Sequence, residues 1–424
     1  MDYKIPSGVY FFQGARNSVL CDTRNGKVYS LNSVSSKQIR ESQVDSELAR
    51  MLIQLDLLCI EKKEEEEKLV KSSELEFAWF EVTTSSCNLR CRHCYLGNPV
   101  NSFSKKRKMP QEQWREIIAQ TYSLGVRSCQ FIGGEPLLYN HRVDGVLDLC
   151  DYACECGYKR VEIFSNLQLV TKELAQRIKS QRIRVATSLY SVVPFVHDSI
   201  TGHTGSQEKT VSAIRLLKEL GVDVRVEIVL MSLNQDTVEE TISFLEQLGV
   251  RHRTPDPIRP TGFGSDEFLL PDEKYLYRYG LMLEPNFYAS KRRILRNQDY
   301  NNCLANKFVV TENGDIFPCV FTRRNAYGNV RQGSVSEILN GVGARKVRKI
   351  TKDSILVCQD CEYRYVCSDC RPLAADTYQT EDAFSCYPNP RCTYNPYTGV
   401  WGKGIWVQKN SKLEYEPFPS SSES

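Results

Sequence analysis

The amino-acid sequence predicts an α/β protein built around a partial barrel of six parallel strands, with a small domain before it and a cysteine-rich region after it. Strand-like and helix-like segments alternate from residue 76 to about residue 256, which is typical of a parallel sheet covered by helices. Six repeats are fewer than the eight that close a barrel, so the sheet should stay open, with its chemistry at the carboxyl ends of the strands. Cysteines, prolines and aromatic residues dominate from about residue 300 onward, where metal sites would replace part of the apolar core.

Length and composition place the chain among soluble proteins of more than one domain. It has 424 residues, of which 41% are hydrophobic and 25% are charged, and its formal net charge is only +3. No apolar run approaches the roughly 18 residues that a membrane-spanning helix needs. The N-terminal residues lack the pattern of a secretion signal. We therefore expect a cytoplasmic protein that does not cross a membrane and has no nucleic-acid partner.

Six strands and five helices are predicted in the central region. The strand-like runs cover residues 76–84, 128–132, 160–165, 184–189, 222–230 and 250–254. Helical patterns lie near residues 111–123, 143–155, 171–179, 206–220 and 236–248. Each of the first five strands is thus followed by a helix, as the crossovers of a parallel sheet require.

The chain divides into five predicted parts. A type I′ hairpin signal at Asn25-Gly26 and helical spacing of apolar residues over 46–58 predict a small N-terminal domain, and the charged run at 61–68 predicts a linker. The parts are residues 1–70 for this domain and linker, 71–265 for the barrel, 266–300 for a bridging region, 301–410 for the cysteine-rich domain and 411–424 for a flexible tail.

Seventeen cysteines are many for a reducing compartment, where clustered cysteines point to metal ligation. Three follow the first barrel strand: Cys87, Cys91 and Cys94. Eight lie in the C-terminal region: Cys303, Cys319, Cys358, Cys361, Cys367, Cys370, Cys386 and Cys392. The other six are interpreted as ordinary buried thiols: Cys21, Cys59, Cys129, Cys150, Cys154 and Cys156.

The first cysteine group predicts an iron-sulfur site with one open iron. Three and then two residues separate Cys87, Cys91 and Cys94, and the aromatic Tyr95 follows. Three thiolates can hold three irons of a 4Fe-4S cubane and leave the fourth iron for another ligand. This spacing resembles the signature of the radical S-adenosylmethionine superfamily, which implies that S-adenosylmethionine chelates the open iron and is cleaved to a 5′-deoxyadenosyl radical. The alternative is a structural zinc site with His93 as the fourth ligand.

A glycine-containing loop after the second strand is a second element of the predicted site. It consists of Gly133, Gly134, Glu135 and Pro136. Glycines let a ligand approach the backbone closely, and a carboxylate can accept a hydrogen bond from an ammonium group. In the superfamily this stretch meets the amino group of S-adenosylmethionine. The alternative is an ordinary tight turn.

Residues at the ends of the next three strands complete the cofactor site that the resemblance implies. Ser165 and Asn166 end the third strand where relatives contact the ribose. Ser188 ends the fourth strand near the methionine carboxylate, and Leu230 ends the fifth near the adenine. The alternative for these positions is a helix cap or a turn.

The C-terminal cysteines are enough to fill two further cubanes, since a fully ligated 4Fe-4S cluster takes four thiolates. Their order resembles the SPASM extension of radical S-adenosylmethionine enzymes, which binds two auxiliary 4Fe-4S clusters. The resemblance implies Cys303, Cys319 and Cys370 for the first cluster, and Cys358, Cys361 and Cys367 with either Cys386 or Cys392 for the second. Cys367 and Cys370 are closer together than in many relatives, so the first auxiliary cluster is a candidate for an open iron. Zinc ribbons are the alternative.

The hairpin and helices of the first 60 residues resemble the winged-helix element that binds leader peptides in maturases of ribosomally made peptides. We therefore expect an enzyme that takes a side-chain hydrogen from a precursor peptide with a leader and forms a cyclophane or thioether cross-link. Its auxiliary clusters would accept an electron, and a flavodoxin- or ferredoxin-type protein would donate electrons. The alternatives are a sulfatase-maturating-type protein oxidase and a metal-stabilised peptide-binding protein without turnover. No catalytic acid or base is identified.

Two further features are interpreted as structural. His197, Asp198 and His203 lie in a predicted loop after the fourth strand, where helix capping explains them, with positioning of the substrate as the alternative. The basic run from Lys105 to Lys108 is interpreted as solvated surface, with guidance of an acidic peptide as the alternative.

Overall fold

The computed structural model describes residues 3–60, 75–97, 109–141, 145–324, 326–410 and 412–418. The chain forms two compact units, each assembled from segments that are distant in sequence. We call residues 74–280 and 306–346 the barrel unit, and residues 1–73, 281–305 and 347–424 the cysteine-rich unit. The five sequential parts stay predictions. The predicted linker at 61–68 and the basic run at 105–108 lie outside the described residues.

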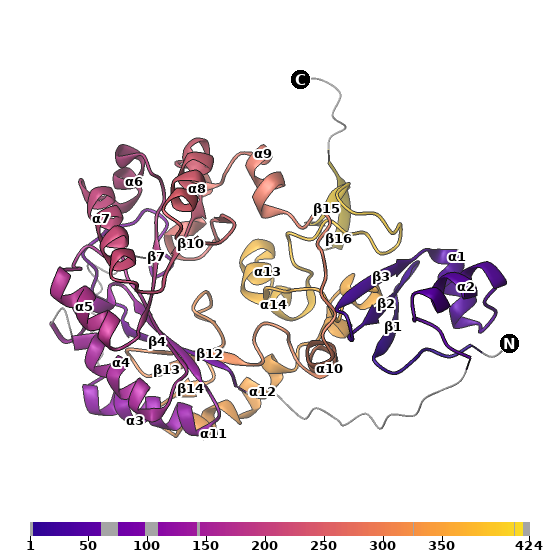
Figure 1. Ribbon diagram of the computed structural model, residues 1–424, viewed down its shortest axis with the longest axis horizontal. Helices are drawn as coiled ribbons and strands as arrows, with labels where there is room; N and C mark the ends of the chain where they lie inside the picture. The colour runs from indigo at the N-terminus through magenta and orange to yellow at the C-terminus, as the bar shows by residue number, and fades with distance from the viewer. Residues whose placement is uncertain are drawn as a thin grey trace. The chain divides into compact units, whose positions relative to one another are not determined.

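A parallel sheet forms the centre of the barrel unit (Figure 1). Its strands are β4 (Phe77–Thr83), β5 (Ser128–Gly133), β6 (Arg160–Phe164), β7 (Arg184–Ser188), β8 (Val224–Glu227) and β10 (Arg251–His252). They pair in the order β10-β8-β7-β6-β5-β4, and every pairing is parallel. The predicted open α/β sheet of six parallel strands is confirmed.

The sheet continues beyond β4 with strands that the sequence analysis did not predict. β12 (Lys307–Thr311) pairs in parallel with β4, and β13 (Asp315–Phe317) and β14 (Gly328–Asn329) follow as antiparallel strands. Phe308 and Val310 of β12 are buried in the same core as the barrel strands. The strand β12, which follows Cys303 in the sequence, therefore extends the barrel sheet beyond β4.

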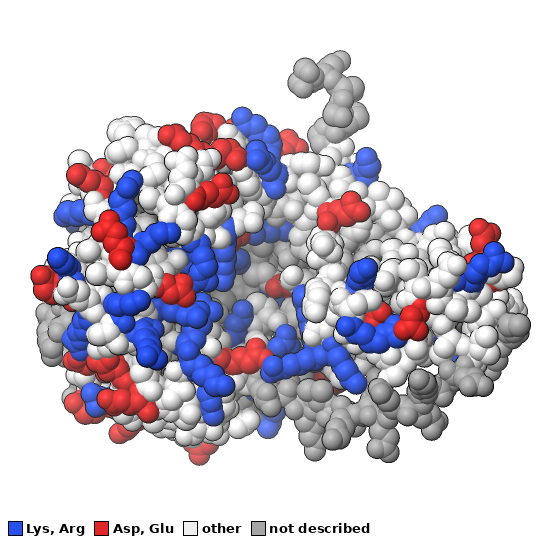
Figure 2. Space-filling view, in the orientation of Figure 1, with Lys and Arg blue, Asp and Glu red and all other residues white. Residues whose placement is uncertain are grey.

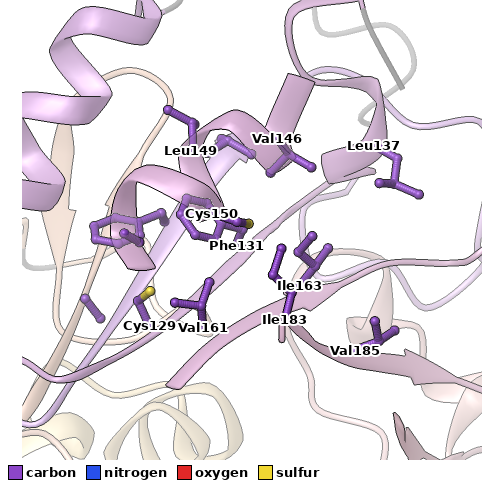
Figure 3. Close-up of a cluster of buried hydrophobic side chains, with 14 of the residues drawn as sticks. Cys129, Phe131, Leu137, Val146, Leu149, Cys150, Val161, Ile163, Ile183 and Val185 are labelled. Atoms are coloured by element: carbon purple, nitrogen blue, oxygen red, sulfur yellow. The ribbon is translucent and has the colours of Figure 1, made fainter. Parts of the chain in front are cut away.

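Helices cover one face of this sheet (Figure 1). They include α3 (Gln111–Ser123), α4 (Gly145–Cys156), α5 (Lys172–Ser180), α7 (Ser206–Glu219) and α8 (Val238–Gln247), close to the predicted ranges. Alternate strand side chains such as Phe131 and Ile163 point to Val146 and Leu149 of α4 (Figure 3). Because side chains alternate along a strand, the remaining ones face the opposite, inner side of the sheet.

Polar side chains occupy the amino-terminal part of this inner side. Trp79 Nε1 donates to Gln130 Oε1 at 3.0 Å, and Arg225 pairs with the buried carboxylate of Glu162 at 2.7 Å. Phe164 lies two residues beyond Glu162 on the same face and lines a cavity. The carboxyl ends of the strands are therefore the part of the inner face that is left for a ligand.

Two expectations about the scattered residues need correction. His197 and Asp198 do not lie in a loop, because α6 (Pro194–Thr201) begins with Pro194 at its first turn, a position that proline favours. Cys129 and Cys150 are buried in the core (Figure 3) and Cys21 is also buried, as expected, but Cys154 is exposed on α4, and Cys59 and Cys156 are only partly buried.

The cysteine-rich unit begins with a three-stranded antiparallel sheet and two helices. These are β1 (Val9–Gln13), β2 (Ser18–Asp22), β3 (Lys27–Leu31), α1 (Ser33–Arg40) and α2 (Ser46–Gln54). The β2–β3 hairpin is confirmed, but its type I′ turn is not. Asp22 pairs with Lys27, so the loop has four residues, and Gly26 has a positive φ whereas Asn25 does not. The winged-helix comparison stays a prediction.

Part of the rest of this unit, including Ile294 of α10 and Val366, packs against that sheet. It contains α10 (Lys291–Asp299), α13 (Arg371–Tyr378), α14 (Ala383–Cys386), β15 (Gly404–Lys409) and β16 (Lys412–Pro417). Phe12 of β1 packs edge-on against Tyr365 with ring centroids 4.7 Å apart. Residues 412–417 were expected in a flexible tail but form β16, which pairs with β15.

Among the described residues, no helix combines the length and the apolar character needed to span a membrane. Figure 2 shows Lys and Arg interspersed with Asp and Glu over the face that is drawn, in keeping with the small net charge.

Candidate functional site

A cavity of about 240 Å³ lies in the barrel unit at the carboxyl ends of the strands. Nine of the residues predicted for the first cluster and its cofactor line it: Cys87, Cys91, Cys94, Tyr95, Gly133, Gly134, Ser165, Asn166 and Ser188. They come from the segments that follow β4, β5 and β6 and from the end of β7. Parallel strands bring these segments to one edge of the sheet, which is why residues far apart in the sequence meet there.

The three thiols of the cavity are held in their neutral form until a metal displaces their protons. Burial raises the pKa of Cys87 to about 11 and raises the pKa values of Cys91 and Cys94 as well. Among the described residues, no three His, Cys, Asp or Glu side chains are arranged to hold a single metal ion. In a cubane each thiolate binds a different iron, so the donor set fits a cluster better than one zinc ion.

The two glycines of the loop after β5 let it lie directly against the cysteine loop. Gly133 has φ +150°, and a β-carbon there would overlap the backbone oxygen of Thr83. A β-carbon on Gly134 would overlap the backbone oxygen of Ser86. The backbone N–H of Glu135 donates to that same Ser86 oxygen at 2.8 Å. Glycine is therefore required at both positions by close backbone approach.

The carboxylate of Glu135 does not line the cavity, and its expected contact with a ligand ammonium group stays a prediction. It is fully buried and accepts hydrogen bonds from Ser165 Oγ at 2.8 Å, Leu137 N at 3.0 Å and Asn166 N at 2.8 Å. Burial raises its pKa to about 7, against the opposing effect of these hydrogen bonds. Glu135 thus fastens the loop after β5 to the end of β6.

Two other predicted contacts are also absent from the cavity lining. Pro136 is buried at the start of a short 3₁₀ helix, and Leu230 is fully buried in the helix-facing core. Val229 lines the cavity in place of its neighbour Leu230, because successive strand residues face opposite sides.

The structure adds Tyr190 to the cavity and places His93 and His197 beside it. The ring of His93 meets the ring of Tyr190 edge-on at 4.7 Å, and Tyr190 N donates to His197 Nδ1 at 3.2 Å. Burial lowers the pKa values of both histidines to about 4, so both are neutral at physiological pH. Tyr190 lies two residues beyond Ser188, and this strand periodicity was the available signal for it.

A buried ion pair supports the wall of the cavity beside Tyr95. Tyr95 Oη donates to Glu81 Oε1 at 3.0 Å, and Arg323 Nη2 pairs with the same oxygen at 2.6 Å. Glu81 is fully buried on β4, and Arg323 follows β13. The ring of Tyr95 also meets Phe321 edge-on at 5.8 Å. The segment after β13 thereby holds the cysteine loop in place.

A second cavity in the cysteine-rich unit gathers four of the predicted auxiliary ligands: Cys358, Cys361, Cys367 and Cys392. Cys386 does not line it and lies at the end of α14. Burial raises the pKa of Cys392 to about 12, and the nearby Cys367 and Cys358 contribute. Four thiols around one small cavity are the ligand set that a 4Fe-4S cluster takes.

The remaining auxiliary ligands belong to different units. Cys303 and Cys370 are in the cysteine-rich unit, whereas Cys319 is in the barrel unit. The first auxiliary cluster therefore stays a prediction.

Comparisons with known families agree with this arrangement. Residues 82–245 match the Radical SAM superfamily, and residues 302–362 match the SPASM iron-sulfur cluster-binding domain. The first match covers the first cysteine group and the barrel strands from β5 to β8. The second begins just before Cys303 and ends just after Cys361.

Similar proteins include enzymes of peptide and of haem metabolism. The antilisterial bacteriocin subtilosin biosynthesis protein AlbA of Bacillus subtilis is 27% identical over 273 residues, which cover 62% of this chain and 59% of AlbA. An AdoMet-dependent heme synthase of Nitratidesulfovibrio vulgaris is 24% identical over 75% of this chain and 92% of its own length.

A solved structure with the same fold is Streptococcus suis SuiB bound to its precursor peptide SuiA. It has a TM-score of 0.56 and 15% sequence identity, and the superposition covers 92% of this chain and all of SuiB. The resemblance inferred from the cysteine motifs is confirmed: the chain carries a radical SAM domain over residues 82–245 and a SPASM iron-sulfur cluster-binding domain over residues 302–362.

Proposed function

We propose that the protein is a radical S-adenosylmethionine maturase that cross-links a ribosomally made precursor peptide. The observation that carries the proposal is the single cavity in which Cys87, Cys91 and Cys94 meet the loop of Gly133 and Gly134. The three thiolates would hold three irons of a 4Fe-4S cluster. The cluster would supply one electron that cleaves bound S-adenosylmethionine to methionine and a 5′-deoxyadenosyl radical, and this radical would take a hydrogen atom from a substrate side chain.

The side chains around this cavity would position the cofactor. Asn166 Nδ2 donates to Asn88 Oδ1 at 2.7 Å and lies 3.9 Å from the sulfur of Cys87, so it fixes the cysteine loop next to the end of β6. The backbone of the two glycines can approach a bound ligand closely. Apolar and aromatic side chains such as Phe164 and Phe321 would exclude water from the reacting groups.

The auxiliary sites would take up the electron that bond formation releases. A substrate radical that forms a new bond and loses a proton must also lose one electron. Cys358, Cys361, Cys367 and Cys392 would hold one acceptor cluster, and Cys303, Cys319 and Cys370 would contribute to the other. A flavodoxin- or ferredoxin-type protein would be the external electron donor.

The substrate would be held by its leader at the N-terminal sheet. β1 and β3 are the edge strands of this sheet, and an extended peptide can pair with such an edge as an additional strand. AlbA and the SuiB–SuiA complex support a peptide substrate by similarity. The cross-link would be of the cyclophane or thioether type.

The test is anaerobic incubation of the reconstituted protein with S-adenosylmethionine, a strong reductant and the precursor peptide encoded next to its gene. We expect 5′-deoxyadenosine and a peptide lighter by two hydrogen atoms per cross-link. A Cys91→Ala variant is the matched control and should give neither product. An unchanged peptide together with turnover of a porphyrin or of a folded sulfatase would contradict the proposal.

A further inference from the structure

A buried ammonium group lies in the wall of the second cavity. Lys352 is only 7% exposed and lines this cavity together with Cys358 and Cys367. Its Nζ donates to the backbone oxygen of Ser368 at 3.0 Å, and it also interacts with the side chain of Cys367. The ammonium therefore points at the sulfur ligands and not at solvent.

The neighbouring charges leave Lys352 without a carboxylate of its own. Asp369, the carboxylate that acts on Lys352 electrostatically, is engaged by the buried guanidinium of Arg371 at 2.6 Å and by the backbone N–H of Cys370 at 2.8 Å. Among the described residues, no carboxylate forms an ion pair with Lys352. Glu362 lies beside Cys361, where it accepts a hydrogen bond from Tyr394.

A buried cation costs several kcal/mol unless an anion compensates it. The charged side chains that act on the thiol of Cys358 are Lys352, Arg371 and Asp369, which together carry one positive charge. The thiolates of a bound cluster would supply the missing negative charge, because a 4Fe-4S cluster with four thiolates is anionic in both of its common oxidation states. Adding an electron to such a cluster is easier next to a fixed positive charge.

We infer that Lys352 is a positioning residue for electron transfer, whose fixed charge raises the reduction potential of the cluster held by Cys358, Cys361, Cys367 and Cys392. The inference rests on the proposed function. The substrate radical would lose a proton to solvent and one electron to the cluster held by these cysteines. An external flavodoxin- or ferredoxin-type protein would then take up that electron. Lys352 thus makes this cluster the acceptor.

The test is a reductive titration of the reconstituted full-length protein, followed by electron paramagnetic resonance. The background carries Cys87→Ala, Cys91→Ala and Cys94→Ala, so only auxiliary clusters contribute. Lys352→Met removes the charge at similar volume, and we expect the one-electron reduction equilibrium to become at least tenfold less favourable, a downward shift of about 59 mV. Lys349→Met, on an exposed lysine three residues away, should leave the potential unchanged.

Two further variants keep the test decisive. Lys352→Arg retains the charge and should keep the potential near that of the background protein. Cys392→Ala should remove the signal that shifts in Lys352→Met, which assigns the signal to this cavity. If Lys352→Met does not retain its iron, Lys352→Gln is titrated in its place.

An unchanged potential in a neutral variant with full iron content would overturn the inference about Lys352. A background protein without any auxiliary iron would instead refute the proposed function, so the two failures are distinguishable. Removing the buried charge should also leave the metal-free protein at least as stable as before, measured as its thermal midpoint. A lower midpoint would indicate a structural role and count against the inference.

Discussion

Replacing Glu135 with glutamine distinguishes a carboxylate that holds two loops together from one that binds a ligand. Oε1 accepts from Ser165 Oγ and Leu137 N, and Oε2 accepts from Asn166 N. A glutamine can keep the first two bonds with its oxygen, but its amide NH₂ then faces the N–H of Asn166. One hydrogen bond is lost and a buried donor is left without a partner, which costs about 1–3 kcal/mol. A domain of this size loses roughly 2–4 °C per kcal/mol, so we expect the thermal midpoint to fall by about 5 °C.

The assay is thermal unfolding of the metal-free protein at pH 8, where Glu135 is mostly ionised because burial places its pKa at about 7. Glu116→Gln, on an exposed residue of α3, is the matched control and should leave the midpoint unchanged. Binding of S-adenosylmethionine to the reconstituted variant should weaken only in proportion to its loss of stability. An unchanged thermal midpoint together with greatly weakened binding of S-adenosylmethionine would refute the reasoning, because it would indicate that Glu135 contacts the ligand directly.

Three other predictions follow from the geometry of the same cavity. Gly134→Ala should lower the iron bound at the first cysteine group, measured by iron analysis, because a β-carbon would overlap the backbone oxygen of Ser86; full iron content would contradict the tight approach of the two loops. Arg323→Met should lower the stability by about 3 kcal/mol, since it leaves the buried carboxylate of Glu81 without its cation, and thermal unfolding should show part of this loss restored by an additional Glu81→Gln. Burial lowers the pKa of His197 to about 4, below its ordinary 6.5, so its contribution to stability is complete above pH 6.5 and is lost as the pH falls towards 4. His197→Gln should therefore reduce the loss of stability between pH 6.5 and pH 4 by about 3 kcal/mol. Identical pH profiles of the thermal midpoint in the variant and the wild-type protein would argue against this prediction.

The sequence predicted the parts of the molecule that local patterns determine. The alternation of apolar runs placed the six strands, and the spacing of Cys87, Cys91 and Cys94 identified the cluster loop. Both signals are local: a strand shows its period within a few residues, and a metal site shows its spacing within one loop. The carboxyl-end rule for parallel sheets then placed Gly133 and Ser188 near the cysteines.

Contacts between distant segments were not predictable in the same way. β12 pairs with β4 although more than 220 residues separate them, and no local pattern reports such a partner. The direction of Glu135 depends on which N–H groups of the next loop come within reach. The choice of Cys392 over Cys386 depends on how α14 turns its last residue relative to the cavity. Each of these features is decided by tertiary packing.

The most direct measurement compares iron content and cofactor cleavage between the wild-type protein and the variant with Cys87→Ala, Cys91→Ala and Cys94→Ala. Both proteins are purified and reconstituted without oxygen and incubated with S-adenosylmethionine and a strong reductant. We predict that the variant loses about four irons per chain, keeps the iron of its auxiliary sites and forms no 5′-deoxyadenosine. Equal iron content, or continued formation of 5′-deoxyadenosine by the variant, would contradict the assignment of these cysteines to the radical-generating cluster.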